Sequence, residues 1–532
     1  MDDGLTAGWL VAVLYRALRR STHARPLGLV DDPYENVVLV PAAHVATANA
    51  ILQPLRDAIA LRAGTVAAQG EAPPVAWRVV TTLRALGVDV TDPTDRDATS
   101  AAVRNCLQQR VVEPIHRIIE DVEEHGGARA AAFWVARTFV LPNLAYVQQL
   151  WGLHADPTAW TDADTALDAL CQSLCPSDLR DTLADGRATL REELALPMRL
   201  GGLGIPFARR SAPIMAAKLW TKAIAERTGA DAALLREAFR PRTASGVPGA
   251  LPEPVTSDAF AEACAATLPD RVPGPQRRAF DRRRELNSMR GGTWVFDGVP
   301  WDTDRHLADA EWDIAWRLAF GGLTDRQRAR IDAPDDGFAW RGRVAEWALK
   351  RAVEETMPAT LKVWEQPGPD HLPPDHLARC TAAGVAPDAW RRADLAFEYF
   401  DGRTITVDVR TANCLASSAL RCSSAAGHLK AIEDTKRRRY AGYYTEFRPL
   451  AIALTGAVTE DSFSTVKEIA RAAARVDRPR LDWEPARWAV LVLRRLQVAV
   501  IRTVTRGVTR APWGVREGDR AGFRPACPPS GR

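Results

Sequence analysis

The spacing of apolar residues separates a helical stretch of the chain from short stretches that favour strands. In RVVEPIHRIIEDVEEH (110–125) and AAAFWVARTFVLPNLAYVQQLW (130–151), apolar residues recur every three and four positions, which predicts amphipathic helices. Short apolar runs in VVLVPAAH (37–44) and WRVVTTLRALGVDVTD (77–92) indicate strands and turns instead. We therefore expect both elements in the first hundred residues and mainly helices over 101–235.

A β-hairpin is the clearest pattern in the second half. LAFEYF (395–400) is an apolar, aromatic run, DGR (401–403) is a turn, and TITVDV (404–409) alternates like a half-buried strand. This pattern places Asp394 at the start of the first strand and Asp408 in the second.

The hairpin is followed by a basic helix, KAIEDTKRRRY (430–440), in which Lys436 and Tyr440 lie one turn apart on the same face. Acids near the ends of adjacent strands can hold Mg²⁺, which prefers carboxylate oxygens, and a nearby lysine can orient or help to deprotonate a metal-bound water. This is the chemistry of metal-dependent phosphodiester cleavage. The alternative is structural, since acids beside hairpins occur in many α/β domains.

Length and composition divide the chain further. The 532 residues allow two or three domains, and the fold class that we expect is mixed α+β and α/β. Pro, Gly and Arg concentrate between 240 and 292, which predicts a linker, and the last residues have the composition of a disordered tail. The expected segments are 1–100 with mixed elements, 101–239 helical, 240–292 linker, 293–510 a second domain, and 511–532 tail.

Charge and cysteine content restrict the function only slightly. The net charge of +4 does not by itself imply nucleic acid, although most basic residues are arginine, the better ligand for phosphate. A GC-rich coding sequence produces the same bias. The eight cysteines include no CxxC pair, which argues against a disulfide scaffold and a cysteine zinc site and fits a reducing compartment. Arg494 and Arg495 interrupt the apolar stretch 488–504, and we expect no membrane segment.

Several segments resemble the reverse transcriptases of non-LTR retrotransposons. LALPMRLGGLGIPFARRSAPIMAAKLW (194–220) is similar to the thumb signature of that family, RTFVLPNLAYVQQLWGL (137–153) to the preceding helix, and LRALGVDVTD (83–92) to a palm strand. The resemblance implies a palm remnant in 1–100 and a thumb-like region in 101–239. Where the family carries two metal-binding aspartates, this chain has a degenerate polymerase site of Tyr34, Glu35 and Asn36. We therefore expect no reverse transcriptase activity.

Residues 310–460 resemble the restriction-endonuclease-like domain, of PD-(D/E)xK type, found in the site-specific branch of that family. The resemblance rests on EWDIAWRLAFGGLTD, WRGRVAEWALKRAVEETM, RRADLAFEYFDGRTITVDVRT and the helix that follows. It implies an α/β nuclease domain in which Asp394 and Asp408 hold Mg²⁺ and Lys436 activates water. Arg410 stands where the family usually has a lysine, and it would position the phosphate together with Tyr440.

The first helix of such a domain can add a third acid, for which Glu346 is the candidate. Because Glu354 and Glu355 lie on the same charged helix, a solvated face explains Glu346 as well. His371, His376 and Cys380 lie where the family often carries a zinc knuckle. Its first two cysteines are missing here, so we expect no zinc.

The expected partners are DNA and the element's RNA, and the basic cluster 277–284 favours nuclear import, with a solvated charged run as the alternative. The residues predicted to contact nucleic acid are Arg199, Arg277, Arg278, Arg282, Arg283, Arg437 and Arg438. Two functions stay open. One is a Mg²⁺-dependent DNA endonuclease that nicks a target site, and the other is a catalytically inactive nucleic-acid-binding remnant or the product of a decayed element.

Overall fold

The computed structural model describes most of the chain beyond residue 95 and short strands before it. The described ranges are 37–39, 78–80, 82–85, 88–91, 96–124, 128–180, 188–225, 257–272, 274–297, 307–332, 337–357, 361–368, 392–399, 401–416, 419–477 and 484–509, with a few single positions. The predictions that fall outside them concern Tyr34, Glu35, Asn36, His371, His376, Cys380 and the tail 511–532.

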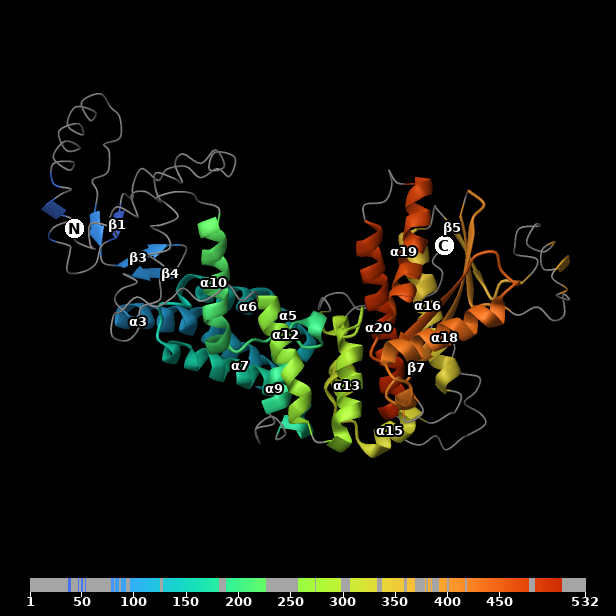
Figure 1. The fold of residues 1–532 in the computed structure, drawn as a ribbon, viewed down its shortest axis with the longest axis horizontal. Helices are drawn as coiled ribbons and strands as arrows, with labels where there is room; N and C mark the ends of the chain where they lie inside the picture. Colours follow the sequence, from blue (N-terminus) through green and yellow to red (C-terminus); the bar gives the residue numbers. More distant parts are fainter. Residues whose placement is uncertain are drawn as a thin grey trace, which may run out of the picture.

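The described chain forms a helical part and a part built on a β-sheet, with α13 between them (Figure 1). Before the helices, β1 (Val37–Leu39) pairs in parallel with β2 (Arg78–Val80), and β3 (Thr82–Ala85) pairs antiparallel with β4 (Val88–Thr91). These strands lie in the two segments that were predicted to be extended.

The helical part follows from the three- and four-residue apolar spacing. Its helices are α3 (Arg96–Leu107), α4 (Glu113–Glu124), α5 (Arg129–Val135), α6 (Leu141–Trp151), α7 (Thr161–Leu174), α9 (Ala188–Ala195) and α10 (Ala208–Ala225). Phe133, Leu144 and Leu167 are fully buried in the core. By length and composition alone, the helical run Arg129–Trp151 is apolar enough to cross a membrane, a property that buried core helices share. Helices over 101–235 are confirmed for the described residues.

The segment 257–288 differs from the linker that its composition predicts. It contains α12 (Ser257–Thr267) and α13 (Gly274–Ser288), and α13 packs on α14 and α18. Proline is compatible with the first turn of a helix, so Pro275 does not prevent α13 from forming. Phe280 and Leu286 are buried, and they anchor the helix although five of its residues are arginines.

The second part contains one four-stranded sheet. The strands are β5 (Leu361–Glu365), β6 (Leu395–Tyr399), β7 (Thr404–Ala412) and β8 (Phe447–Ala453), in the order β5-β6-β7-β8. Strands β5, β6 and β7 run antiparallel, and β8 is parallel to β7. The helices are α14 (Asp309–Phe320), α15 (Asp325–Asp332), α16 (Gly337–Thr356), α18 (Ala425–Tyr440), α19 (Glu460–Asp477) and α20 (Pro485–Thr509).

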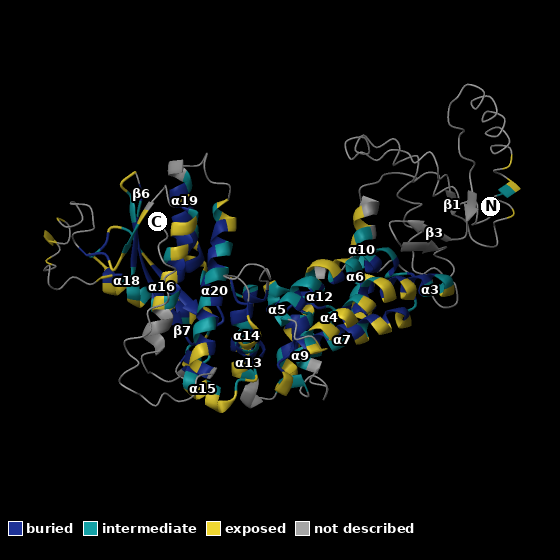
Figure 2. Cartoon of the chain, turned by 180° about the vertical axis from the view of Figure 1, so that it is seen from behind, coloured by how far each residue is buried: buried dark blue, intermediate teal, exposed yellow. Residues whose placement is uncertain are grey.

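Helices cover both faces of this sheet. Residues 405, 407 and 409 of β7 pack into the large core with α16, α19 and α20, whereas Ala412 and β8 residues pack on α18 (Figure 2). Strand β7 is therefore buried from Ile405 to Val409 on both faces. The prediction of a half-buried strand is wrong, because a helix covers each face. The mixed α+β class is confirmed, and the hairpin is present, with Gly402 at a φ of +81° in its turn.

Candidate functional site

Asp394 and Asp408 face each other across two neighbouring strands. Leu395 of β6 pairs with Val407 of β7, so the antiparallel register places Asp394 opposite Asp408. Side chains directly opposite each other in such a pair lie on the same face with Cβ atoms about 5 Å apart. The Oδ2 atom of Asp394 accepts a hydrogen bond from the backbone N–H of Val409 (2.7 Å). The hairpin therefore brings the two acids together, as the sequence predicted.

The position of Asp394 is fixed from both sides by backbone contacts. Its carbonyl accepts a hydrogen bond from the N–H of Gln366 (2.8 Å), at the end of β5. The N–H of Ala393 donates to the hydroxyl of Tyr444 (2.8 Å). These contacts hold the strand start rigidly, which is what a site built from two strands requires.

Lys436 reaches this pair from α18. Its ammonium forms an ion pair with Oδ1 of Asp408, whose side chain is only 2% exposed, while that of Lys436 is 18% exposed. Helix α18 begins at the N-cap Ser424, whose hydroxyl accepts from the N–H of Gly427 (2.9 Å), and its buried Leu429 packs towards the sheet. This geometry fixes which residues of α18 face β7, and Lys436 is one of them.

A third acid, Glu346, contributes to the same electrostatic environment from α16. Burial raises the pKa of Glu346 to about 7, and the carboxylates of Asp394, Glu365 and Asp408 act in the same direction. Glu346 is half-buried, whereas Glu354 and Glu355 of the same helix are exposed. The explanation as a solvated face therefore fits those two residues and not Glu346.

The pKa of Asp394 is also raised. Burial and the charge of Asp408 raise it to about 6, while the Val409 N–H and the charges of Lys436 and Arg410 act in the opposite direction. Mutual repulsion between buried acids is relieved either by a proton or by a bound cation. The group is therefore suited to bind a cation or a proton.

Tyr440 and Arg410 differ in burial, since Tyr440 is buried and Arg410 is exposed. Tyr440 is 3% exposed, its hydroxyl donates to the Arg392 carbonyl (3.0 Å), and its ring packs against Phe447. Burial, followed by the contact with Asp408, raises its pKa, so the hydroxyl stays protonated. The buried Tyr440 supports the start of β6, and the role in positioning a phosphate that the resemblance implies stays a prediction. Arg410, two residues after Asp408, is exposed and open to a ligand.

The donor set has the chemistry of a Mg²⁺ site but is not arranged as a finished one. Among the described residues, no three His, Cys, Asp or Glu side chains stand close enough to form a metal-binding group. Asp408 is engaged by Lys436, while Oδ1 of Asp394 has no hydrogen-bond partner within the described ranges. Carboxylate oxygens are the preferred ligands of Mg²⁺, so the residues present fit this ion once Asp408 exchanges its partner.

Most of the arginines predicted to contact nucleic acid form contacts within the protein. Arg199 pairs with Asp258 (2.7 Å), and Arg277 pairs with Asp270 (3.3 Å). The remaining contacts are those of Arg282 with the Cys422 carbonyl, of Arg283 with Glu193, of Arg437 with Asp434 and Asp461, and of Arg438 with its own helix. Within the described ranges, Arg278 is the one predicted contact that has no such partner.

Two residues that lie near these groups, Glu365 and Arg421, were not identified from the sequence. Glu365 ends β5, pairs in the sheet with Leu395 and forms an ion pair with Lys350 (2.5 Å). Its position beside the acids follows from sheet pairing, for which LKVWE gives no local signal. Arg421 lies in a short turn before α18, and a single arginine in a loop has no recognisable pattern.

In comparisons with known proteins, no family model and no curated protein matches this chain. The functional assignment therefore depends on the geometry of the site and on the resemblance described above.

Proposed function

We propose that this protein is a Mg²⁺-dependent endonuclease that nicks DNA. The observation that supports this proposal best is the convergence of Asp394 and Asp408, from opposed positions on two strands, with Lys436 from the next helix. The order of elements, α16-β5-β6-β7-α18-β8, agrees with the endonuclease-like resemblance of residues 310–460. For the helical part and the strands before it, we propose an origin from the palm and thumb of a reverse transcriptase, on the resemblance alone.

Asp394 and Asp408 would hold Mg²⁺, with Glu346 as an additional acid. When bound, the ion would neutralise the phosphate and lower the pKa of a bound water. Lys436 would then release Asp408 and interact instead with the attacking water or with the negative charge that develops on the phosphate. Arg410 extends from the same strand as Asp408 and is always cationic, so it can bind a phosphate oxygen but cannot act as a base.

Tyr440 is a positioning residue in this scheme. It lies one turn beyond Lys436, and the Lys436 ammonium is 5.9 Å from the centre of its ring. The protonated hydroxyl holds the Arg392 carbonyl two residues before Asp394, which fixes the start of β6 relative to α18.

A catalytically inactive nucleic-acid-binding protein is the second candidate. The ion pair between Lys436 and Asp408 favours it, because this pair satisfies the acid without a metal. The same ion pair is compatible with an active nuclease, in which Lys436 would have to release Asp408 before Mg²⁺ binds. The two functions therefore differ in activity rather than in fold.

A plasmid-nicking assay separates them. We expect the wild type to convert supercoiled DNA to the nicked form with Mg²⁺ and not with EDTA. Asp394→Asn and Asp408→Asn, which keep the shape but remove the charge, should reduce the rate by at least about 100-fold. Glu354→Gln, an exposed acid on α16, is the matched control and should cleave normally. Equal cleavage by wild type and Asp408→Asn would overturn the proposal, and DNA binding by a wild type that does not cleave would favour the second candidate.

A further inference from the structure

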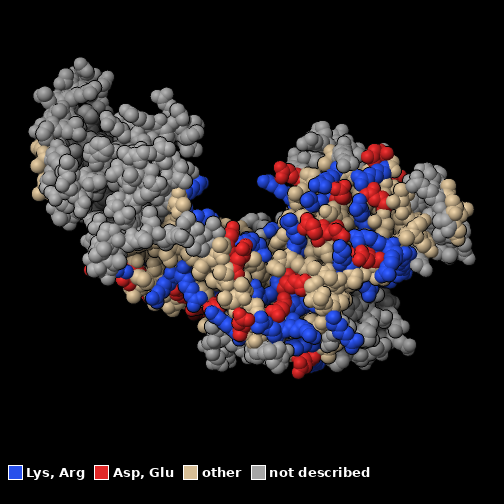
Figure 3. All heavy atoms as spheres, viewed as in Figure 1, with Lys and Arg blue, Asp and Glu red and all other residues tan. Residues whose placement is uncertain are grey.

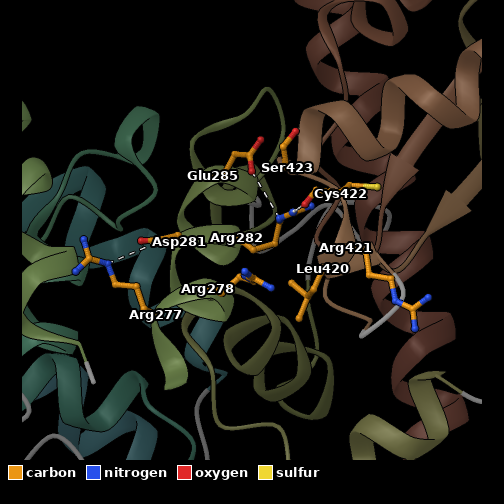
Figure 4. A pocket seen from close by; sticks show the side chains of 9 residues that line it. All are labelled: Arg277, Arg278, Asp281, Arg282, Glu285, Leu420, Arg421, Cys422 and Ser423. Atoms are coloured by element: carbon orange, nitrogen blue, oxygen red, sulfur yellow. Dashed lines mark hydrogen bonds and ion pairs between the residues drawn. The ribbon is translucent and has the colours of Figure 1, made fainter. Parts of the chain in front are cut away.

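A polar pocket lies where α13 meets the turn before α18, at the opposite end of that helix from Tyr440. Its volume is about 540 Å³, and its lining comes from α13 and from the segment 420–423 (Figure 4). Leu420 is the one aliphatic residue of the lining, and no aromatic residue contributes to it. Without an aromatic surface the pocket offers no platform for a nucleobase, and it is better suited to an anionic group than to a ring.

The pocket has an excess of positive charge. Four arginines (277, 278, 282 and 421) and two acids (281 and 285) line it, which leaves +2 (4 − 2). Arg277 is paired with Asp281 (3.6 Å), and Glu285 accepts from the N–H groups of Ala425 (2.6 Å) and Ala426 (3.0 Å) at the start of α18. Both acids are therefore already engaged within the protein.

Of the other three arginines, two are open to a ligand, and the third has one nitrogen without an acceptor. Arg278 and Arg421 are exposed, and within the described ranges they have no ion pair or hydrogen bond. Arg282 is 4% exposed, donates through Nη2 to the Cys422 carbonyl (2.6 Å) and pairs through Nε with Glu285 (3.7 Å), but its buried Nη1 has no partner among the described residues. A buried guanidinium nitrogen without an acceptor is costly, and a phosphate oxygen would satisfy it.

The exposed side of α18 extends this positive charge towards the acid pair. Lys430 and Arg438 are exposed on it, and Figure 3 shows lysine and arginine side chains gathered over α13 and α18 on one face of the molecule, with acids between them. Ser424 and Lys436 are separated by twelve residues of helix, a rise of about 18 Å. Consecutive base pairs are spaced about 3.4 Å apart, so this length corresponds to about five base pairs.

We propose that this pocket binds a backbone phosphate of duplex DNA that lies along α18, so that a second phosphate of the same duplex reaches the site at Asp408. The second contact rests on the proposed nuclease function, whereas the pocket contact does not. Arg278 and Arg421 contact the phosphate from the open side, and Nη1 of Arg282 contacts it from the buried side. Such contacts fix the position of a duplex without reading its sequence.

The test is the binding of a fluorescent duplex of about 20 base pairs, measured by anisotropy with EDTA over a range of salt concentrations. We expect Arg278→Ala/Arg421→Ala to weaken binding about tenfold or more at low salt and to reduce the slope of log K against log salt by about 1 to 2. Arg471→Ala/Arg487→Ala removes two exposed charges outside the pocket and should have a smaller effect. Arg278→Lys/Arg421→Lys should restore the slope because it keeps both charges.

Equal affinity and slope in the pocket variant and the Arg471/Arg487 control would overturn the inference. The inference would also be overturned if the lysine variant had the same reduced salt slope as the alanine variant. That result would show that the substitutions disturb the structure rather than remove a charge that binds DNA. Glu354→Gln, an exposed acid outside the pocket and the acid pair, should bind the duplex like the wild type. If no protein nicks DNA but the pocket variant still loses salt-dependent binding, the proposed nuclease function fails while the pocket contact stands.

Discussion

At the scale of single residues, the chemistry of the site depends on whether the carboxyl groups of Asp394 and Glu346 carry a proton or bind a cation. Asp394 and Glu346 have pKa values raised to about 6 and about 7, first by burial and then by neighbouring carboxylates. A carboxyl group with a raised pKa holds its proton more tightly in the folded protein than in the unfolded chain. Without a metal, its stabilising effect is present below about pH 4 and is lost as the pH rises through about 6 to 7.

Mg²⁺ binding should have the opposite pH dependence, because only ionised carboxylates bind the ion. We expect the affinity for Mg²⁺ to rise about tenfold or more between pH 5.5 and pH 7.5 in calorimetric titrations. Glu346→Gln should weaken the pH dependence of Mg²⁺ binding. Glu354→Gln changes an exposed acid further along α16 and should leave this pH dependence unchanged. Mg²⁺ binding that is equally strong at both pH values would exclude Asp394 and Glu346 as ligands.

At the scale of elements, the sequence predicted what depends on short-range pattern. The hairpin of β6 and β7, helix α18 and the opposed places of Asp394 and Asp408 follow from apolar runs, one turn and helical spacing. The place of Lys436 beside these acids was implied by the family resemblance. The burial of β7 on both faces could not be predicted, because it depends on how α16 and α18 pack against the sheet, which the local pattern of β7 does not show. Glu365 was missed for the same reason, since its position beside the acids is set by strand pairing.

The turn after β8 is held by a contact that should not tolerate a side chain. Gly456 has a φ of +89°, and a Cβ atom there would lie 2.1 Å from Cγ of the buried Gln497. Gln497 donates to the carbonyls of Gly456 (3.1 Å) and Gly291, which joins α20 to two turns. We expect Gly456→Ala to lower the free energy of unfolding by about 2 to 4 kcal/mol, from backbone strain and overpacking.

Gly507 is the matched control, because a Cβ there meets open space within α20. Gly507→Ala should be neutral or stabilise the protein by up to about 1 kcal/mol, since alanine favours a helix. Urea unfolding of both variants measures the difference. A Gly456→Ala variant as stable as Gly507→Ala would show that Gln497 does not hold this turn.

At the scale of the whole molecule, α13 joins the helical part to the sheet. Composition predicted a linker because proline, glycine and arginine are frequent there, and composition does not show that the arginines find acids and carbonyls from both parts. Arg283 lies near Glu193 of the helical part (3.9 Å), whereas Arg282 reaches the Cys422 carbonyl in front of α18. We therefore expect the two parts to unfold together rather than as independent domains.

Asn287 of α13 tests this coupling. It is 1% exposed, and its Nδ2 donates to the carbonyls of Ala319 in α14 (2.7 Å) and of Gly201 in the helical part (3.4 Å). Asn287→Ala leaves both carbonyls without this donor but also removes the buried, unpartnered Oδ1, so we expect a loss of about 1 to 2 kcal/mol. The neighbouring Ser288 is exposed and bonds only within its own helix (2.9 Å), so Ser288→Ala should have little effect. In calorimetry, Asn287→Ala should lower the melting temperature and broaden or split the transition, whereas two separate transitions already in the wild type would show that α13 does not couple the two parts.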